Sequence, residues 1–100
     1  MPASQRRRAF GQHFLNDEKV IARIVEETYE KIDRTGAHAM LEVGPGRGAI
    51  TSPLLKRFAD SRLERFLIVE KDERLAEFWI EEGKRIDRPE KSVEVLSADF

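Results

Sequence analysis

A glycine-rich turn directly after a short apolar run is the feature that most restricts the folds open to this chain. Residues 39–43 are mostly apolar and indicate a strand, and Gly44-Pro45-Gly46-Arg47-Gly48 follow at once. A glycine turn that leads from a strand into a helix brings backbone against a ligand, because no side chain intervenes. The helix start also offers free N–H groups to a carboxylate or phosphate. The segment therefore predicts a ligand at the turn, with a tight turn that binds nothing as the alternative.

The rest of the chain alternates between helical and strand patterns. A first helix is predicted from Asn16 or Asp17 to about Gly36, and a second from Ser52–Pro53 onward. A third is predicted over residues 73–85, with Phe78 and Trp79 in the core. Two further strands are predicted over residues 66–69 and 93–96. Such alternation is typical of a parallel sheet with right-handed crossovers. We expect an α/β fold, namely a helix followed by the βαβαβ half of a Rossmann-like sheet with strand order 3-2-1. The first strand is expected to be buried on both faces.

Composition narrows the functional classes. The chain has 100 residues, enough for one small domain, and no cysteine, which excludes disulfide frameworks and thiol catalysis. No apolar run approaches the roughly 20 residues that a membrane span requires. The two histidines lie far apart in the sequence and do not form a recognisable metal-ligand set. We therefore expect a cytoplasmic protein that uses neither a membrane nor a metal.

The first 16 residues differ in charge from the rest of the chain. Arg6, Arg7 and Arg8 stand together with aromatic residues after them, and no acidic residue precedes Asp17, although the formal net charge of the whole chain is only −1. Such a basic arm can contact RNA phosphates and stack on bases. A solubilising tail is the alternative. We divide the chain into an arm, residues 1–16, and a cofactor-binding domain, residues 17–100.

Three carboxylates accompany the turn. Glu70 ends the second strand, where an acidic residue can accept hydrogen bonds from the ribose hydroxyls of an adenosine-containing cofactor. Asp99 follows the third strand at the same edge and could accept from an adenine amine, unless it is an ordinary turn residue. Glu42 is an acid inside an apolar strand and needs a partner. That partner is either an arginine or the ammonium group of the cofactor.

The spacing alone leaves the cofactor class open. Gly44, Gly46 and Ala49 also satisfy the dinucleotide pattern G-x-G-x-x-G/A, which occurs in nicotinamide-dependent oxidoreductases. A NAD-dependent oxidoreductase half is therefore one alternative, and a non-catalytic RNA-binding or assembly module that uses the basic arm is another.

Two segments together resemble a known family. Phe10-Gly11-Gln12-His13-Phe14-Leu15-Asn16-Asp17 and Leu41-Glu42-Val43-Gly44-Pro45-Gly46-Arg47-Gly48-Ala49-Ile50-Thr51 are similar to segments of the bacterial small-subunit (16S) rRNA adenine dimethyltransferases. The resemblance covers about residues 8 to 100. It implies that His13 and Leu15 line an S-adenosylmethionine pocket, that Gly44 and its neighbours cradle the methionine part, and that Glu70 and Asp99 bind ribose and adenine. The family often has asparagine at the position of His13, and histidine can also donate one hydrogen bond.

The resemblance also implies an activity for the parent protein. It is N6,N6-dimethylation of two adjacent adenines of small-subunit rRNA, in a 30S-type pre-ribosomal particle. The family's Asn-Leu/Ile-Pro-Tyr motif, which holds the target adenine, would follow a fourth strand, and a helical C-terminal domain would follow later; neither is found in these residues.

No catalytic residue is therefore expected among residues 1–100, since the resemblance implies that the acceptor motif lies beyond Phe100. We expect an inactive fragment that keeps most cofactor contacts. We also expect the free edge of its sheet to favour self-association.

This expectation is tested by incubating purified residues 1–100 with S-adenosylmethionine and small-subunit rRNA. No methyl group should reach the RNA, since the acceptor motif is expected elsewhere. Mass spectrometry of the digested RNA is the measurement, and dimethyladenosine above the no-protein control would contradict the expectation.

Overall fold

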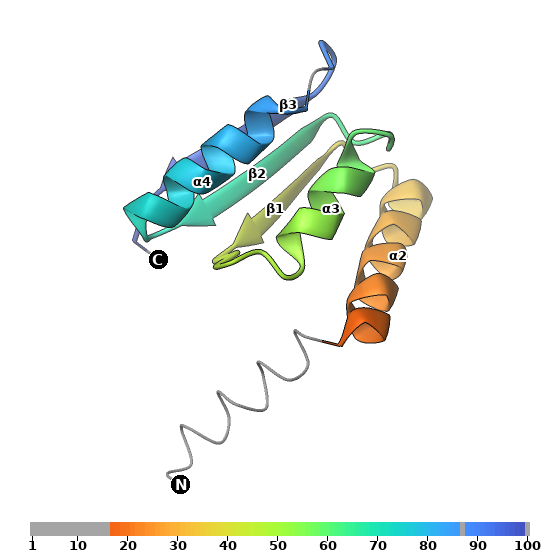
Figure 1. The fold of residues 1–100 in the computed structure, drawn as a ribbon. Coiled ribbons are helices and arrows are strands. Elements are labelled where there is room, and N and C mark those ends of the chain that lie inside the picture. The colour runs from red at the N-terminus through yellow and green to blue at the C-terminus, as the bar shows by residue number, and fades with distance from the viewer. Residues whose placement is uncertain (1–16, 87, 100) are drawn as a thin grey trace, which may run out of the picture.

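The computed structural model describes residues 17–86 and 88–99. The elements follow in the order α2 (Glu18–Thr35), β1 (Ala39–Val43), α3 (Thr51–Phe58), β2 (Arg65–Glu70), α4 (Glu73–Lys84) and β3 (Ser92–Ser97) (Figure 1). The predicted helices and strands are confirmed, with small differences at their ends. Among these residues no helix is both long enough and apolar enough to cross a membrane. The predicted arm and Phe100, the residue beyond which the acceptor motif is expected, lie outside the described residues.

The three strands form one parallel sheet in the order β1-β2-β3. This is the predicted order 3-2-1 seen from the opposite edge, with Val43 beside Val69 and Val69 beside Leu96. Both crossovers run in the same direction across the sheet, so right-handed connections place α3 and α4 on the same face. Figure 1 shows these two helices in front of the strands, with α2 beside α3 and the carboxyl ends of the strands at one edge.

The core lies between the sheet and this single layer of helices. Phe58 of α3 and Phe66 of β2 meet edge to face, with ring centroids 5.6 Å apart. Trp79 of α4 is fully buried in the same cluster. The other buried apolar members are Val25, Tyr29, Ile32, Leu54, Leu55, Leu63 and Ile68.

The prediction that β1 is buried on both faces is wrong for the described residues. Leu41 and Val43 point to the face that carries no helix, and 59% and 52% of their surfaces are exposed. Leu96 of β3 lies on that face as well and is 60% exposed. The cause is topological, because two same-handed crossovers cover only one side of a sheet. Self-association at the free edge of β1 stays a prediction.

Phe78 lies at the surface of α4 and not in the core. The sequence predicts it in the core, but it is 45% exposed. Its neighbour Trp79 takes the inward position on α4, and the two rings meet edge to face at 4.8 Å. Adjacent helix positions lie about 100° apart around the axis, so the two large rings point in different directions.

Helix α2 is capped at its start and bonded to α3 along its inner face. Asp17 caps its start by accepting from the N–H groups of Lys19 and Val20, at 3.0 and 3.2 Å. The buried Tyr29 hydroxyl donates to the Leu54 carbonyl of α3 at 2.6 Å, and burial raises the pKa of this phenol. The Tyr29 hydrogen bond attaches α2 to α3.

Two phenylalanines provide a matched test of this packing. Phe58→Ala should lower the free energy of unfolding by about 3–5 kcal/mol, since it empties a fully buried site. Phe78→Ala should cost at most about 1.5 kcal/mol, because it loses mainly the ring contact with Trp79. Denaturant unfolding followed by circular dichroism measures both values. Equal losses would contradict the assignment of Phe58 to the core and Phe78 to the surface.

Candidate functional site

The glycine turn follows β1 without a break in the hydrogen-bond pattern of the sheet. The Gly44 N–H donates to the Val69 carbonyl at 2.8 Å, and the Gly48 N–H donates to the Pro45 carbonyl at 3.0 Å. Gly44, Gly46 and Gly48 have φ values of 70°, 57° and 85°. Residues with side chains rarely adopt these left-handed values, so the tight turn requires glycine.

The turn borders a hollow of about 350 Å³. The hollow is lined by Glu42 and by residues 44–50, so the backbone of the turn forms most of its wall. A Cβ atom added to Gly46 would meet nothing within 4 Å, which shows that one side of this residue is open. Helix α3 starts beside the hollow, and no side chain caps it. The first N–H groups of such a helix are suited to an anionic group of a ligand.

Glu70 holds the turn from the end of β2. Its carboxylate is buried and accepts two backbone hydrogen bonds, from Gly46 N–H to Oε1 at 3.1 Å and from Asp72 N–H to Oε2 at 3.0 Å. Asp72 in turn caps α4. A carboxylate has about four acceptor positions, so two remain for a ligand such as a ribose diol. Glu70 thus links the glycine turn to the start of α4, a structural role in addition to the ribose binding that the sequence predicts.

Glu42 has a different partner from the arginine considered above. Its Oε1 accepts a hydrogen bond from the Thr51 hydroxyl at 2.6 Å. Its Oε2 is buried and has no hydrogen-bond partner in the described part of the chain. Burial raises the pKa of Glu42, and the Thr51 hydrogen bond opposes this shift. An unpaired buried carboxylate oxygen is costly, and at the wall of the hollow it is suited to a cationic donor such as an ammonium group.

The predicted site residues fall into two groups. The structure brings Glu42, Gly44, Gly46 and Glu70 together around the turn. Asp99 forms the second group and is exposed just beyond β3. The neighbouring Ala98 N–H donates to the Glu70 carbonyl at 3.1 Å, so Asp99 lies at the same edge of the sheet as Glu70.

The other predicted residues are His13, Leu15, Arg6, Arg7 and Arg8, and all belong to the segment that the structure leaves undescribed. Phe100 is undescribed as well, so the structure does not test the expectation that the catalytic motif follows it. The position of that motif stays a prediction.

Two residues at the site are not predicted by the sequence. Thr51 is fully buried and holds Glu42, and Trp79, predicted only as core, donates from its indole N–H to the Gly46 carbonyl at 3.2 Å. Thr51 stands three residues after Gly48 and could have been noticed as a polar residue at the helix start. No sequence signal places Trp79 at the turn, because it lies on α4, 33 residues beyond Gly46.

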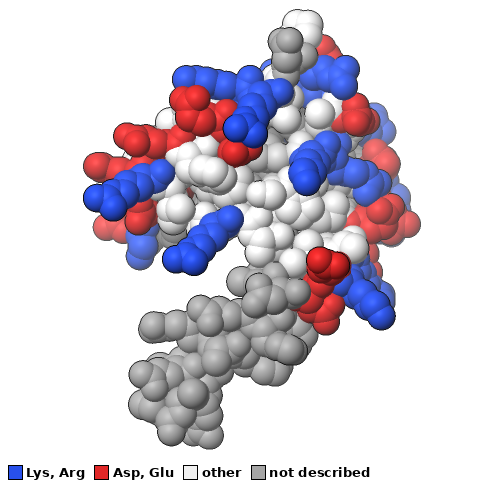
Figure 2. Space-filling model, viewed as in Figure 1, with Lys and Arg blue, Asp and Glu red and all other residues white. Residues whose placement is uncertain are grey.

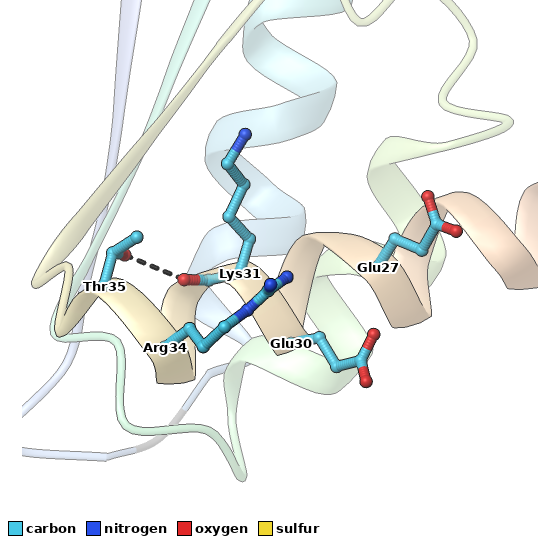
Figure 3. A pocket seen from close by; sticks show the side chains of 5 residues that line it. All are labelled: Glu27, Glu30, Lys31, Arg34 and Thr35. Atoms are coloured by element: carbon cyan, nitrogen blue, oxygen red, sulfur yellow. Dashed lines mark hydrogen bonds between the residues drawn. The ribbon is translucent and has the colours of Figure 1, made fainter.

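A roomier hollow lies along α2. It has a volume of about 650 Å³ and is lined by Glu27, Glu30, Lys31, Arg34 and Thr35. Figure 3 shows that all five side chains come from this one helix. The Thr35 hydroxyl donates to the Lys31 carbonyl of the same helix at 2.8 Å. A hollow formed by one helix with charges of both signs is open surface. We therefore assign the candidate site to the smaller hollow at the turn.

On the face that Figure 2 shows, charge does not mark a nucleic-acid surface. Figure 2 shows acidic and basic side chains interspersed around the layer of helices, with an uncharged area in the middle of the view. Within residues 17–86 and 88–99, no three histidine, aspartate or glutamate side chains gather as a metal site would require.

Comparisons with known proteins agree with the resemblance in the sequence. The model of a family described as "Ribosomal RNA adenine dimethylase" matches residues 3–100. A protein of Leptothrix cholodnii named ribosomal RNA small subunit methyltransferase A is 39% identical over 97 residues, which are 94% of this chain and 30% of that protein. A Bordetella avium protein of the same name is 43% identical over 76 residues, 76% of this chain and 26% of its own length. The chain thus spans less than a third of these relatives.

Glu42→Gln tests the electrostatics of the site. A carboxyl whose pKa is raised by folding favours the folded state fully below its ordinary pKa of 4.5, and this contribution is lost as pH rises through the raised value. At pH 7 the amide, which can still accept from Thr51, should therefore raise the free energy of unfolding above that of the original chain. Below pH 4.5 the difference should disappear.

Denaturant unfolding from pH 3 to pH 8 is the measurement, and Glu77→Gln on the exposed face of α4 is the control. The control should leave the pH profile almost unchanged. Destabilisation by Glu42→Gln at pH 7 would contradict the account.

Proposed function

We propose that this chain, which belongs to the ribosomal RNA adenine dimethylase family, holds S-adenosylmethionine for the methylation of adenine in small-subunit rRNA. The observation that carries this proposal is the buried, unpaired Oε2 of Glu42 beside the open backbone of the glycine turn. S-adenosylmethionine has an ammonium group, a carboxylate and a ribose. The wall of this hollow offers the Glu42 carboxylate and the uncapped start of α3, and Glu70 lies beside it, bonded to Gly46.

The residues have separate roles in this proposal. Glu42 accepts a hydrogen bond from the ammonium group, and the turn at Gly44 and Gly46 lies against the methionine part. Glu70 accepts from the ribose hydroxyls with the acceptor positions that the backbone leaves free, and Asp99 accepts from the adenine amine. His13 and Leu15 complete the pocket from the N-terminal arm.

The proposed reaction of the parent protein is N6,N6-dimethylation of two adjacent adenines. The cofactor supplies an electrophilic methyl group on its sulfonium, so positioning contributes most of the catalysis. The target base must leave its stack to reach that methyl group. Arg6, Arg7 and Arg8 contact phosphates of the rRNA in its pre-ribosomal particle, and the protein works in the cytoplasm.

The glycine pattern that also fits a nicotinamide cofactor makes NAD the informative competitor. Isothermal titration calorimetry should show binding of S-adenosylmethionine to the chain and much weaker or no binding of NAD. Glu70→Gln should weaken S-adenosylmethionine binding about tenfold or more, since it removes a charged acceptor from the ribose and one of the two acceptors for the backbone N–H groups of Gly46 and Asp72. Tighter binding of NAD would contradict the proposal.

Glu64→Gln is the matched control, because Glu64 directly precedes β2, at the end opposite Glu70, and is exposed. It should bind S-adenosylmethionine as the original chain does. Equal affinities for the Glu70 and Glu64 variants would remove Glu70 from the ribose site.

A further inference from the structure

We propose that Trp79 of α4 is a positioning residue for the glycine turn, acting through Gly46 and Gly48 rather than touching the cofactor. The inference rests on the proposed function for its purpose, because the turn is the part of the site that lies against the methyl donor. The contacts of Trp79 with the turn do not depend on that function, and they can be measured without any cofactor.

The first observation is that both peptide groups of Gly46 are held by side chains from other elements. The Trp79 indole N–H donates to the Gly46 carbonyl at 3.2 Å. On the other side, the Gly46 N–H donates to Glu70 at 3.1 Å. Glycine has the greatest backbone freedom, so a glycine at φ 57° needs external contacts to keep one conformation. Trp79 and Glu70 provide those contacts from two elements that are adjacent in the chain.

The second observation concerns the space beside Gly48. A Cβ atom built on Gly48 would lie 2.2 Å from Cη2 and 2.4 Å from Cζ2 of Trp79. Real Cβ atoms essentially never approach other atoms so closely, so the indole edge occupies the space that any other residue would need. The ring is fully buried and cannot move aside without disturbing the core. Gly48 and Trp79 therefore form a complementary pair, and the position of α4 fixes the position of the turn.

Packing alone does not account for this arrangement. An apolar ring at this position could fill part of the volume, but it would present no N–H group to the Gly46 carbonyl. Without that donor the carbonyl would lose its hydrogen bond at the edge of the core, and the turn would have one fewer restraint. The role is therefore to preorganise the backbone of the hollow, which lowers the cost of ordering it when a ligand binds.

Trp79→Phe keeps a buried ring but removes both the N–H donor to Gly46 and the indole carbons Cη2 and Cζ2 beside Gly48. Amide hydrogen exchange of the ligand-free chain is the readout. Exchange over residues 44–50 should become at least about threefold to tenfold faster relative to β2, since the loss of the hydrogen bond alone has an effect of that size. Phe58→Leu is the control, because it alters the same core away from the turn and should speed exchange without this local excess. No local excess in Trp79→Phe would overturn the proposal.

A double-mutant cycle tests the pairing with Gly48. Gly48→Ala should speed exchange of the turn strongly, and Trp79→Leu should relieve part of this effect when the two are combined. The double variant should therefore lose less protection than the product of the two single losses, and a simple product would overturn the proposed pairing.

Calorimetry separates this inference from the proposed function. Trp79→Phe should bind S-adenosylmethionine about threefold to tenfold more weakly than the original chain, and unchanged affinity would overturn the positioning role. If the original chain fails to bind S-adenosylmethionine, the cofactor assignment is wrong, whereas the exchange data still decide whether Trp79 positions the turn.

Discussion

The buried carboxylate of Glu70 joins the glycine turn of the candidate site to the loop that precedes α4. One oxygen accepts from Gly46 in the turn after β1, and the other accepts from Asp72 at the start of α4. A buried charge without partners would be very costly, so these two hydrogen bonds allow a carboxylate at this depth. They also fix the turn relative to the sheet. Trp79 holds the opposite side of Gly46, so the conformation of the turn depends on contacts from β2 and α4.

This dependence explains why the site lies at the carboxyl edge of the sheet. In a parallel sheet every strand ends at the same edge, and here β1 leads to the turn, β2 to Glu70 and β3 to Asp99. Groups far apart in the chain meet there without any long loop. The roomier hollow on α2 has no such convergence, because its five lining residues come from one helix. The buried Glu42 oxygen without a partner and the contact of Glu70 with the turn, rather than volume, identify the site.

Much of the fold follows from the sequence because the signals are local. The period of apolar residues, the helix start at Asp17 and the glycine turn each act within a few residues, and the helices, the strands and the turn lie where they are predicted. The exposed face at Leu41 and Val43 depends on how many helices cover the sheet, which no local pattern records. The Thr51 partner of Glu42 and the Trp79 contact also required the tertiary structure, because the two members of each pair lie on different elements. The ligand roles of Glu42, Glu70 and Asp99 stay predictions.

The most direct test of the central claim is nuclear magnetic resonance of the isotope-labelled chain titrated with S-adenosylmethionine. The account predicts that amide shifts concentrate at residues 44–50, at Glu70 and near Asp99, and that the Trp79 indole N–H shifts with them. The amide shifts of the residues that line the α2 hollow should remain unchanged. Shifts centred on residues 27–35, with the glycine turn unaffected, would contradict the assignment of the methyl-donor site to the turn.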